Sequence, residues 1–370
     1  MATSDRTFAI DGRAIGLDEP PYLIAELGVN HDGDPAKALR LVDAAADAGA
    51  DAVKFQTFHA EALATAAAPQ AEYQRARASA SSQREMLRAL ELPPDGLRAA
   101  FDRARERDIA AFSTPFDVES VATLVDLSVP ALKVGSGDLT NLFLLRRVAA
   151  AGLPLLLSTG MATLDEVDAA VAAIHSAGDP PLALLHCLSA YPAPAAETNL
   201  RAIPAMRERY GVEVGFSDHT TGLAAPIASI ALGATIVEKH LTLDHTAPGP
   251  DHAASMEPEQ LRLLASSLRE AYAALGSGSK GPQPSEADTR RVARRSLVMR
   301  HELPRGARLT EADLDAKRPA DGISPLRLDD VVGRRLTRDM PADAILLPED
   351  LDPPLEPLPP ASSMAGSGPG

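Results

Sequence analysis

Short apolar runs alternate with longer amphipathic segments from residue 22 to about residue 275. The runs are continuously apolar, which is the pattern of parallel strands buried on both faces. The segments between them have helix boundaries: Asp34 fits an N-cap, Pro35 stands at the first helical position, and Gly49 ends that helix. We therefore predict eight strands, over residues 22–27, 52–56, 109–114, 131–135, 153–158, 182–187, 212–216 and 235–239.

Eight strand–helix repeats predict an α/β fold, a (β/α)8 TIM barrel. A doubly wound open sheet is the alternative, but it usually has fewer strands and no site at every strand end. The second connection, residues 58–95, is unusually long and is rich in alanine and glutamine. We expect this insertion to lie over the barrel mouth as a lid or along its flank.

The amino-acid composition of the chain changes after the last predicted helix. Residues 276–291 are rich in glycine, serine and proline, so we expect the barrel domain to span 1–275 and a linker to follow it. Residues 292–352 read as short strands broken by turns, which predicts a small β-rich module. Residues 353–370 lack the apolar content to pack and are predicted to be a disordered tail.

Composition narrows the class of protein. A net charge of −15 over 370 residues argues against nucleic acid and anionic membrane surfaces as partners, although local lysines can still attract a small anion. The single cysteine, Cys187, excludes an internal disulfide and fits a reducing cytoplasm. Neither a signal peptide nor a membrane-spanning apolar run is found, so we expect a cytoplasmic enzyme.

Polar side chains gather where the predicted strands end. Catalytic groups of a barrel come from the C-terminal ends of its strands and from the loops that follow. All eight ends carry such groups, whereas chance would scatter them over both ends of the barrel. In chain order they include Glu26, Lys54, Gln56, Thr114, Lys133, Ser136, Asp138, Ser158, Ser189, Tyr191, Ser217, His219, Glu238, Lys239 and His240.

These groups sort by chemistry. Lysines and hydroxyls form a set suited to a phosphate and a carboxylate, and an inward lysine such as Lys54 needs an anionic partner. The glycines of KVGSGD, residues 133–138, let backbone N–H groups approach an anion. A lysine at a strand end is otherwise often a solvated rim charge, and Tyr191 could simply pack. The set is Lys54, Thr114, Lys133, Ser136, Ser158 and Ser217.

Two histidines end the last two predicted strands. His219 and His240 are at neighbouring positions around the barrel, so their imidazoles can converge on one ion. Two protein ligands leave positions open for water and a substrate oxygen, which suits Lewis-acid catalysis by a divalent ion such as Mn²⁺, with Mg²⁺ or Co²⁺ as alternatives. In isolation, either could be an ordinary loop histidine. We predict no ligand role for His245 and a loop-ordering role for His252.

The ordered motifs IAELGVNH, AVKFQT, FSTPFD, LKVGSGDLTN, LSTGM, HCLSAYP, GFSDHT and VEKHLTLD…GPDH resemble the sialic acid synthase family. The resemblance runs from about residue 20 to residue 350, because the C-terminal module resembles the antifreeze-like SAF domain of these enzymes. It implies a transferase that condenses phosphoenolpyruvate with N-acetylmannosamine or a related N-acyl hexose. It also implies a domain-swapped homodimer, in which the SAF domain caps the partner's barrel and Arg318 of the KRP motif reaches the sugar's N-acyl group.

The same resemblance assigns roles to the strand-end residues. His219 and His240 would bind the metal, and Glu26 would orient or deprotonate the water that attacks carbon 2. The sugar would face Gln56, Asp138, Ser189, Tyr191, Asp251 and Arg318. Phosphoenolpyruvate would be held by Lys54, Thr114, Lys133, Ser136, Ser158 and Ser217.

Departures from the family pattern leave the sugar open. Asp138 replaces a glutamate found in several bacterial relatives, and Leu188 and Ser189 stand where threonine and asparagine are common. A legionaminic-type precursor or an unacylated hexose is therefore an alternative acceptor. A Schiff-base aldolase, with Lys54 or Lys133 as nucleophile, and a non-catalytic carbohydrate-binding protein are the rival classes.

Overall fold

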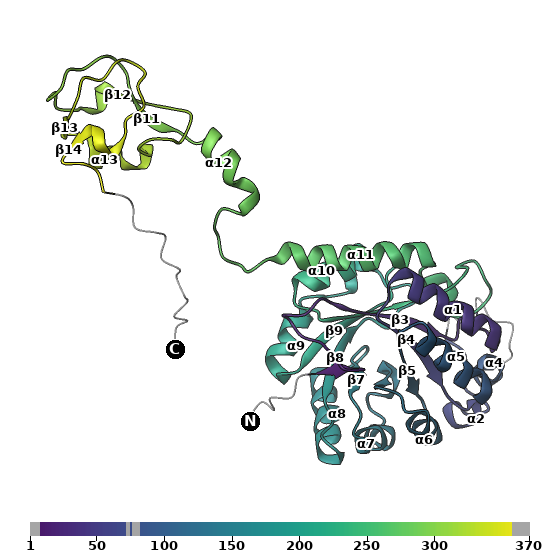
Figure 1. The fold of residues 1–370 in the computed structure, drawn as a ribbon. Coiled ribbons are helices and arrows are strands. Elements are labelled where there is room, and N and C mark those ends of the chain that lie inside the picture. The colour runs from purple at the N-terminus through teal and green to yellow at the C-terminus, as the bar shows by residue number, and fades with distance from the viewer. Residues whose placement is uncertain (1–7, 72–74, 76–81, 357–370) are drawn as a thin grey trace. The chain divides into compact units, whose positions relative to one another are not determined.

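The computed structural model describes residues 8–71, 75 and 82–356. Within it the chain forms two compact units, Met1–Ser277 and Gly278–Gly370. The first unit is a closed barrel of eight parallel strands in the order β10-β3-β4-β5-β6-β7-β8-β9, which confirms the predicted TIM-like barrel (Figure 1). Its strands are β3 (Tyr22–Gly28), β4 (Ala52–Thr57), β5 (Ala110–Pro115), β6 (Leu132–Val134), β7 (Leu155–Ser158), β8 (Leu182–Cys187), β9 (Glu213–Asp218) and β10 (Ile236–His240).

Helices cover the outside of the barrel, and their apolar faces pack on the strands in one continuous core. The helix α1 begins as its sequence predicts: the Asp34 side chain accepts from the Ala36 N–H at 2.8 Å, Pro35 follows, and Gly49 ends it in the left-handed conformation. The helices are α1 (Pro35–Ala48), α5 (Pro94–Glu106), α6 (Val118–Asp126), α7 (Leu142–Ala150), α8 (Leu164–Ala177), α9 (Ala202–Tyr210), α10 (Ala224–Ala231) and α11 (Pro258–Leu275).

Two additions modify the barrel. A short antiparallel pair, β1 (Ala9–Ile10) and β2 (Arg13–Ala14), precedes it, and Arg13 bonds to Asp51 just before β4. The long connection after β4 contains α2 (Ala60–Leu63) and α4 (Gln83–Leu90), which lie side by side. These helices pack through a separate small apolar cluster that includes Val29, Phe58, Met86 and Leu90.

The second unit has its own apolar core. Its antiparallel pairs are β11 (Ser296–Met299) with β12 (Leu314–Lys317) and β13 (Arg335–Leu336) with β14 (Leu351–Asp352), next to the short α13 (Leu328–Val331). The segment predicted as a linker includes the helix α12 (Ala287–Ala293). Leu355, assigned from the sequence to a disordered tail, is instead buried in this core, and residues 357–370 of that tail lie outside the described residues.

No helix among the residues described is both long enough and apolar enough to cross a membrane.

Candidate functional site

A cavity of about 630 Å³ opens at the C-terminal ends of the barrel strands. The family resemblance assigns a role to fifteen residues, and thirteen of them line this cavity. Ser158 does not line it, although this side chain is buried with an unpartnered hydroxyl, and Arg318 lies exposed in the second unit. The thirteen are Glu26, Lys54, Gln56, Thr114, Lys133, Ser136, Asp138, Ser189, Tyr191, Ser217, His219, His240 and Asp251.

Two lysines and two glutamates form a buried charged network at the floor of this cavity. Lys54 pairs with Glu26, and its Nζ lies 3.9 Å from an Oε of Glu238. The Nζ of Lys133 lies 3.3 Å from the other Oε of Glu238. Each of these side chains is at most 8% exposed, so both cations are held in place by anions that are themselves out of water.

The two glutamates have different electrostatic surroundings. Burial raises the pKa of Glu26, because the attraction of Lys54 does not fully offset the loss of water and the repulsion of Glu238. Burial would also raise the pKa of Glu238, but Lys133, Lys54 and the Ser217 hydroxyl together hold it below its usual value. Glu26 is therefore the better proton acceptor of the pair, and Glu238 is the fixed anion.

Backbone geometry makes room for Glu26. The pairing of β3 with β4 shifts register between Glu26 and Gly28, and Gly28 has a φ of 45°. A Cβ at Gly28 would lie 2.7 Å from Oε1 of Glu26, so a larger residue there would displace the carboxylate. Gln56 donates to that same oxygen at 3.0 Å. The carboxylate is thus fixed in direction by its own strand and by the next one.

Hydroxyls surround the lysines. Lys54 donates to the Thr114 hydroxyl at 3.0 Å, and Ser217 donates to Glu238 at 3.0 Å. The Ser136 hydroxyl accepts from the N–H of Gly160 at 3.0 Å. A Cβ at Gly160 would lie 2.4 Å from Oγ of Ser189 and 2.8 Å from Oγ of Ser136, so glycine is needed for the two serines to approach this turn. Cations and hydroxyl donors in this arrangement suit a bound oxyanion.

The two predicted histidines converge. Their ring centroids are 5.3 Å apart, and His219 also packs against the Tyr191 ring at 4.1 Å. Nδ1 of His219 lies 2.8 Å from the Leu188 carbonyl oxygen, so this nitrogen carries the proton and Nε2 keeps a lone pair. Nδ1 of His240 is buried without a hydrogen-bond partner, and burial holds the pKa of this imidazole well below its usual value. Burial alone would lower the pKa of His219, but the Cys187 thiol and the Leu188 carbonyl raise it above its usual value, so a metal ion would compete with a proton for this ring. Two converging imidazoles still fit a divalent metal ion.

Two further carboxylates face the cavity. Asp251 lies 3.7 Å from Nδ1 of His240, and burial raises the pKa of Asp251. Burial also raises the pKa of Asp138, which accepts a hydrogen bond from Asn141 at 3.0 Å. His252, next to Asp251, bonds to Thr242 and Asp32 at 2.7 and 3.1 Å, and its loop-ordering role stays a prediction.

Residues outside the predicted set also shape the site. Lys239 pairs with Asp218 at 2.6 Å, and Asp218 accepts from the N–H of Thr220 at 2.8 Å. Because side chains alternate along a strand, this pair lies on the opposite face of β9 and β10 from His219 and His240. It ties together the two strands that carry the histidines. The role of Glu238 was also missed, although its position two residues before His240 indicates the same inward face.

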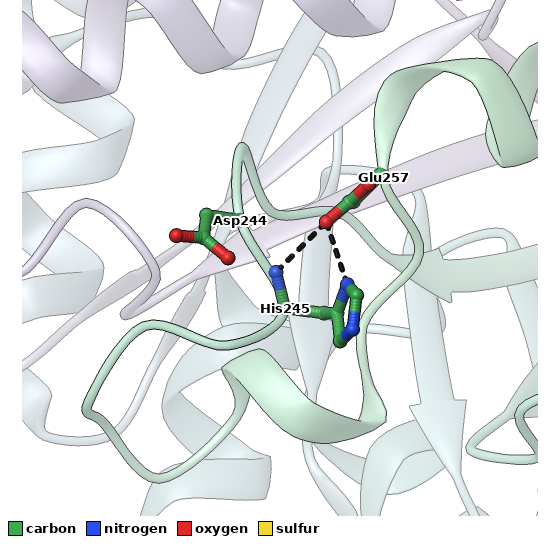
Figure 2. Close-up of side chains that lie close together, drawn as sticks. All are labelled: Asp244, His245 and Glu257. Atoms are coloured by element: carbon green, nitrogen blue, oxygen red, sulfur yellow. Dashed lines mark hydrogen bonds and ion pairs between the residues drawn. The ribbon is translucent and has the colours of Figure 1, made fainter.

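A different group of potential metal ligands lies in the loop between β10 and α11. Ligand atoms of Asp244, His245 and Glu257 lie within 4.8 Å of one another. Figure 2 shows Glu257 bonded to both the backbone N–H and the ring of His245, at 3.2 and 2.6 Å. Asp244 accepts from the N–H and hydroxyl of Thr246. Local hydrogen bonds of an exposed loop account for these contacts, and the absence of a ligand role for His245 stays a prediction.

Comparisons with known proteins identify the family of the chain and its C-terminal domain. Residues 41–280 match the profile of the NeuB family, and residues 294–352 match that of the SAF domain. The chain is 42% identical to an N,N'-diacetyllegionaminic acid synthase of Legionella pneumophila, over 90% of this chain and 94% of the relative. It is 34% identical to the human N-acetylneuraminate-9-phosphate synthase, over 92% and 95%. A solved sialic acid synthetase of Leptospira borgpetersenii superposes with a TM-score of 0.68 at 34% identity, over 77% and 95%.

Proposed function

Because the chain belongs to the NeuB family and carries a SAF domain, we propose that it condenses phosphoenolpyruvate with an N-acylated aldose and water. The products are a nonulosonic acid and phosphate. Named relatives of the family are synthases of legionaminic, pseudaminic and neuraminic acids, which supports this reaction class. The main support for this proposal is that the lysine–glutamate network and the histidine pair line the same cavity.

Phosphoenolpyruvate binds at the cavity floor. Lys54 and Lys133 supply the positive charge, and the hydroxyls of Thr114 and Ser136 donate to the phosphate and carboxylate oxygens. Ser217 lines the same floor and would donate to the substrate in place of Glu238. Ser158 is buried and does not line the cavity, so its contact with phosphoenolpyruvate stays a proposal. The buried anions Glu26 and Glu238 hold both ammonium groups in place before the substrate arrives.

The sugar lies above that floor, with its aldehyde towards the histidines. Gln56, Asp138, Ser189, Tyr191 and Asp251 face its polar groups. A divalent ion held by His219 and His240 would supply Lewis-acid activation of the aldehyde oxygen. Mn²⁺ is our proposed ion, because open coordination by imidazole and oxygen suits it.

The bond changes follow from this placement. Carbon 3 of phosphoenolpyruvate attacks the aldehyde carbon with the electron pair of the enol double bond, and the carbonyl pair goes to the aldehyde oxygen, which takes up a proton. Water adds at carbon 2, where positive charge has developed, and Glu26 accepts one of its protons. The tetrahedral centre then loses phosphate together with the bridging oxygen, and the new hydroxyl gives its remaining proton to the departing phosphate as the ketone forms. A raised pKa suits Glu26 for this role, because a stronger base removes the water proton more readily.

A labelling experiment tests the reaction. Phosphoenolpyruvate carrying ¹⁸O at the bridging position is incubated with Mn²⁺ and a panel of N-acylated and unacylated hexoses. We expect sugar-dependent phosphate release with the label in phosphate. Label retained in the organic product, or release without a sugar, would contradict the proposal. Trapping of a pyruvate adduct by borohydride would favour a Schiff-base aldolase, but Lys54 is held charged by two carboxylates, which makes it a poor amine nucleophile.

The remaining expectations also stay proposals. We propose a domain-swapped homodimer in which Arg318 of the partner chain reaches the N-acyl group of the sugar. Light scattering should give a dimer, and Arg318→Ala should raise KM for the sugar while leaving KM for phosphoenolpyruvate unchanged. A monomer, or an unchanged sugar KM, would refute it. Residence in the cytoplasm and the lack of nucleic-acid or membrane partners stay predictions.

A further inference from the structure

One side of the cavity differs in chemistry from its floor. Apolar side chains from the long connection after β4 and from the ends of β3 and β5 form a continuous lining there. We call this surface the apolar wall. Its residues are Val29, Leu63, Met86, Leu87, Leu90 and Phe116.

The wall is a fixed surface. Met86 and Leu90 are only 4% and 8% exposed and pack in one cluster with Val29 and Phe58. The Ser82 side chain caps the helix that carries them by accepting from the Glu85 N–H at 3.2 Å. The backbone also anchors the connection, since Glu91 accepts from the N–H of Ala60 at 2.5 Å. Packed and capped helices keep their shape, so the wall can select among ligands.

The part of the wall at the end of β5 lies across the mouth from the histidines. In the eight-stranded barrel, β5 is four positions from β9, which leads into His219, and three from β10, which carries His240, whereas β3, which leads into Val29, adjoins β10. An aldose whose aldehyde lies at the histidines and which extends across the mouth therefore has its other end at the β5 side of the wall. This orientation rests on the proposed function. The substituents that meet the wall are those on the carbons far from the aldehyde.

The chemistry of the wall defines those substituents. Moving a methyl group from water to this surface lowers the free energy, whereas a hydroxyl group moved there loses its hydrogen bonds to water. Among the described residues of the lining, the cations are Lys54 and Lys133, and both belong to the floor. A phosphate at the far end of the sugar would find neither of them. Gln83 is the one polar side chain that α4 adds to this lining, and its neutral amide suits an acylamino group.

We propose that the apolar wall selects an acceptor aldose whose far end carries methyl groups, as a deoxy carbon or an acylamino substituent. Sugars with a free primary hydroxyl or a phosphate at that end are disfavoured. The insertion is thus a specificity element of the enzyme, and Leu63 and Leu87 are its most accessible members, being half-buried while lining the cavity.

Three matched sugars test the proposal. The first is 2-acetamido-2-deoxymannose, the second is its 6-phosphate, and the third has a methyl group at carbon 6 and a second acetamido group at carbon 4. We expect kcat/KM for phosphate release to be at least about tenfold higher for the third sugar than for the first, because single methyl-sized differences give roughly 10- to 200-fold discrimination. The phosphorylated sugar should be the poorest.

Variants locate the selectivity. Leu63→Asn and Leu87→Asn should bring the ratio between the third and first sugars close to one, while KM for phosphoenolpyruvate stays constant. Phe58→Leu is the matched control, since Phe58 belongs to the same cluster but does not line the cavity, and it should keep the wild-type ratio. A ratio of one in the wild type, a preference for the phosphate, or an unchanged ratio in both asparagine variants would overturn the inference alone. No release with any of the three sugars would overturn the proposed function as well.

Discussion

The floor and the apolar wall of the same cavity are held in place by different forces. The floor is a set of buried charges in which each cation has an anionic partner. Lys54 and Glu26 come from adjacent strands, whereas Lys133 and Glu238 come from opposite sides of the barrel. The wall is a cluster of apolar side chains, four of them on two short helices outside the barrel repeat and the other two just after β3 and β5. Removing one charge leaves another uncompensated, whereas an apolar surface tolerates a swap of similar volume. The floor therefore requires a particular residue at each position, whereas the wall requires only apolar side chains of suitable volume.

Lys54→Met gives the largest effect that this contrast predicts. It leaves Glu26 without its buried cation, so we expect stability to fall by about 3–5 kcal/mol in urea unfolding. Phosphate release should fall by at least about 1000-fold, because the pocket loses a charge that stabilises the anion. Lys280→Met, at an exposed position, should change neither quantity. A Lys54→Met enzyme with more than a tenth of normal turnover would show that the network is only structural.

His240→Ala separates the two groups of potential metal ligands. We expect Mn²⁺ affinity, measured from the electron paramagnetic resonance of free Mn²⁺, to fall by at least about 100-fold, since a direct ligand should matter more than its supporting partners. His245→Ala is the matched control, because this exposed histidine belongs to the group in Figure 2. If His245→Ala lost Mn²⁺ binding and His240→Ala kept it, the ion would be bound in the loop.

Gly160→Ala tests how closely the floor is packed. The added methyl group would meet the Ser189 and Ser136 hydroxyls at 2.4 and 2.8 Å, so at least one serine must move. We expect kcat/KM to fall roughly 10- to 100-fold, because small displacements of positioning groups have effects of this size. Gly222→Ala is the control, since a Cβ there has nothing within 4 Å and this residue does not line the cavity. Equal kinetics for the two variants would mean that the serines do not need their present positions.

The sequence predicted the floor far better than the wall, for a physical reason. Barrel strands repeat regularly, so the residues at their ends could be assigned to one face, and Lys54, His219 and His240 follow directly from that rule. Glu238 needed one further step, the alternation that places it on the same face as His240. Lys239 also ends a predicted strand, but it is next to His240 in the sequence and therefore points to the other face, where it pairs with Asp218.

The wall had no comparable sequence pattern. Residues 58–95 contain no periodic run long enough to show which side chains face the cavity. The orientation of Leu63 and Leu87 depends on how α2 and α4 pack against the ends of β3 and β5, which is a tertiary contact. Ser158 shows a second limit of the sequence. The end of its strand could be predicted, but whether the last side chain reaches the cavity could not. The structure leaves this serine buried behind the lining.

Met86→Leu should have the smallest effect, and it tests the contrast at its other end. The two side chains have similar volumes, and such swaps in packed clusters usually cost less than about 1.5 kcal/mol. Met86 contributes apolar surface and no charge, so we expect only part of this stability change to affect the transition state. The value of kcat/KM for the preferred sugar should therefore stay within about threefold of the wild type.

Lys54→Arg is the matching experiment at the floor. It keeps the positive charge, but a planar guanidinium does not fit contacts made by a compact ammonium, so the rate of phosphate release should fall at least about tenfold. If Met86→Leu were as damaging as Lys54→Arg, the wall would be specified atom by atom, and its selectivity would depend on shape rather than on its apolar character.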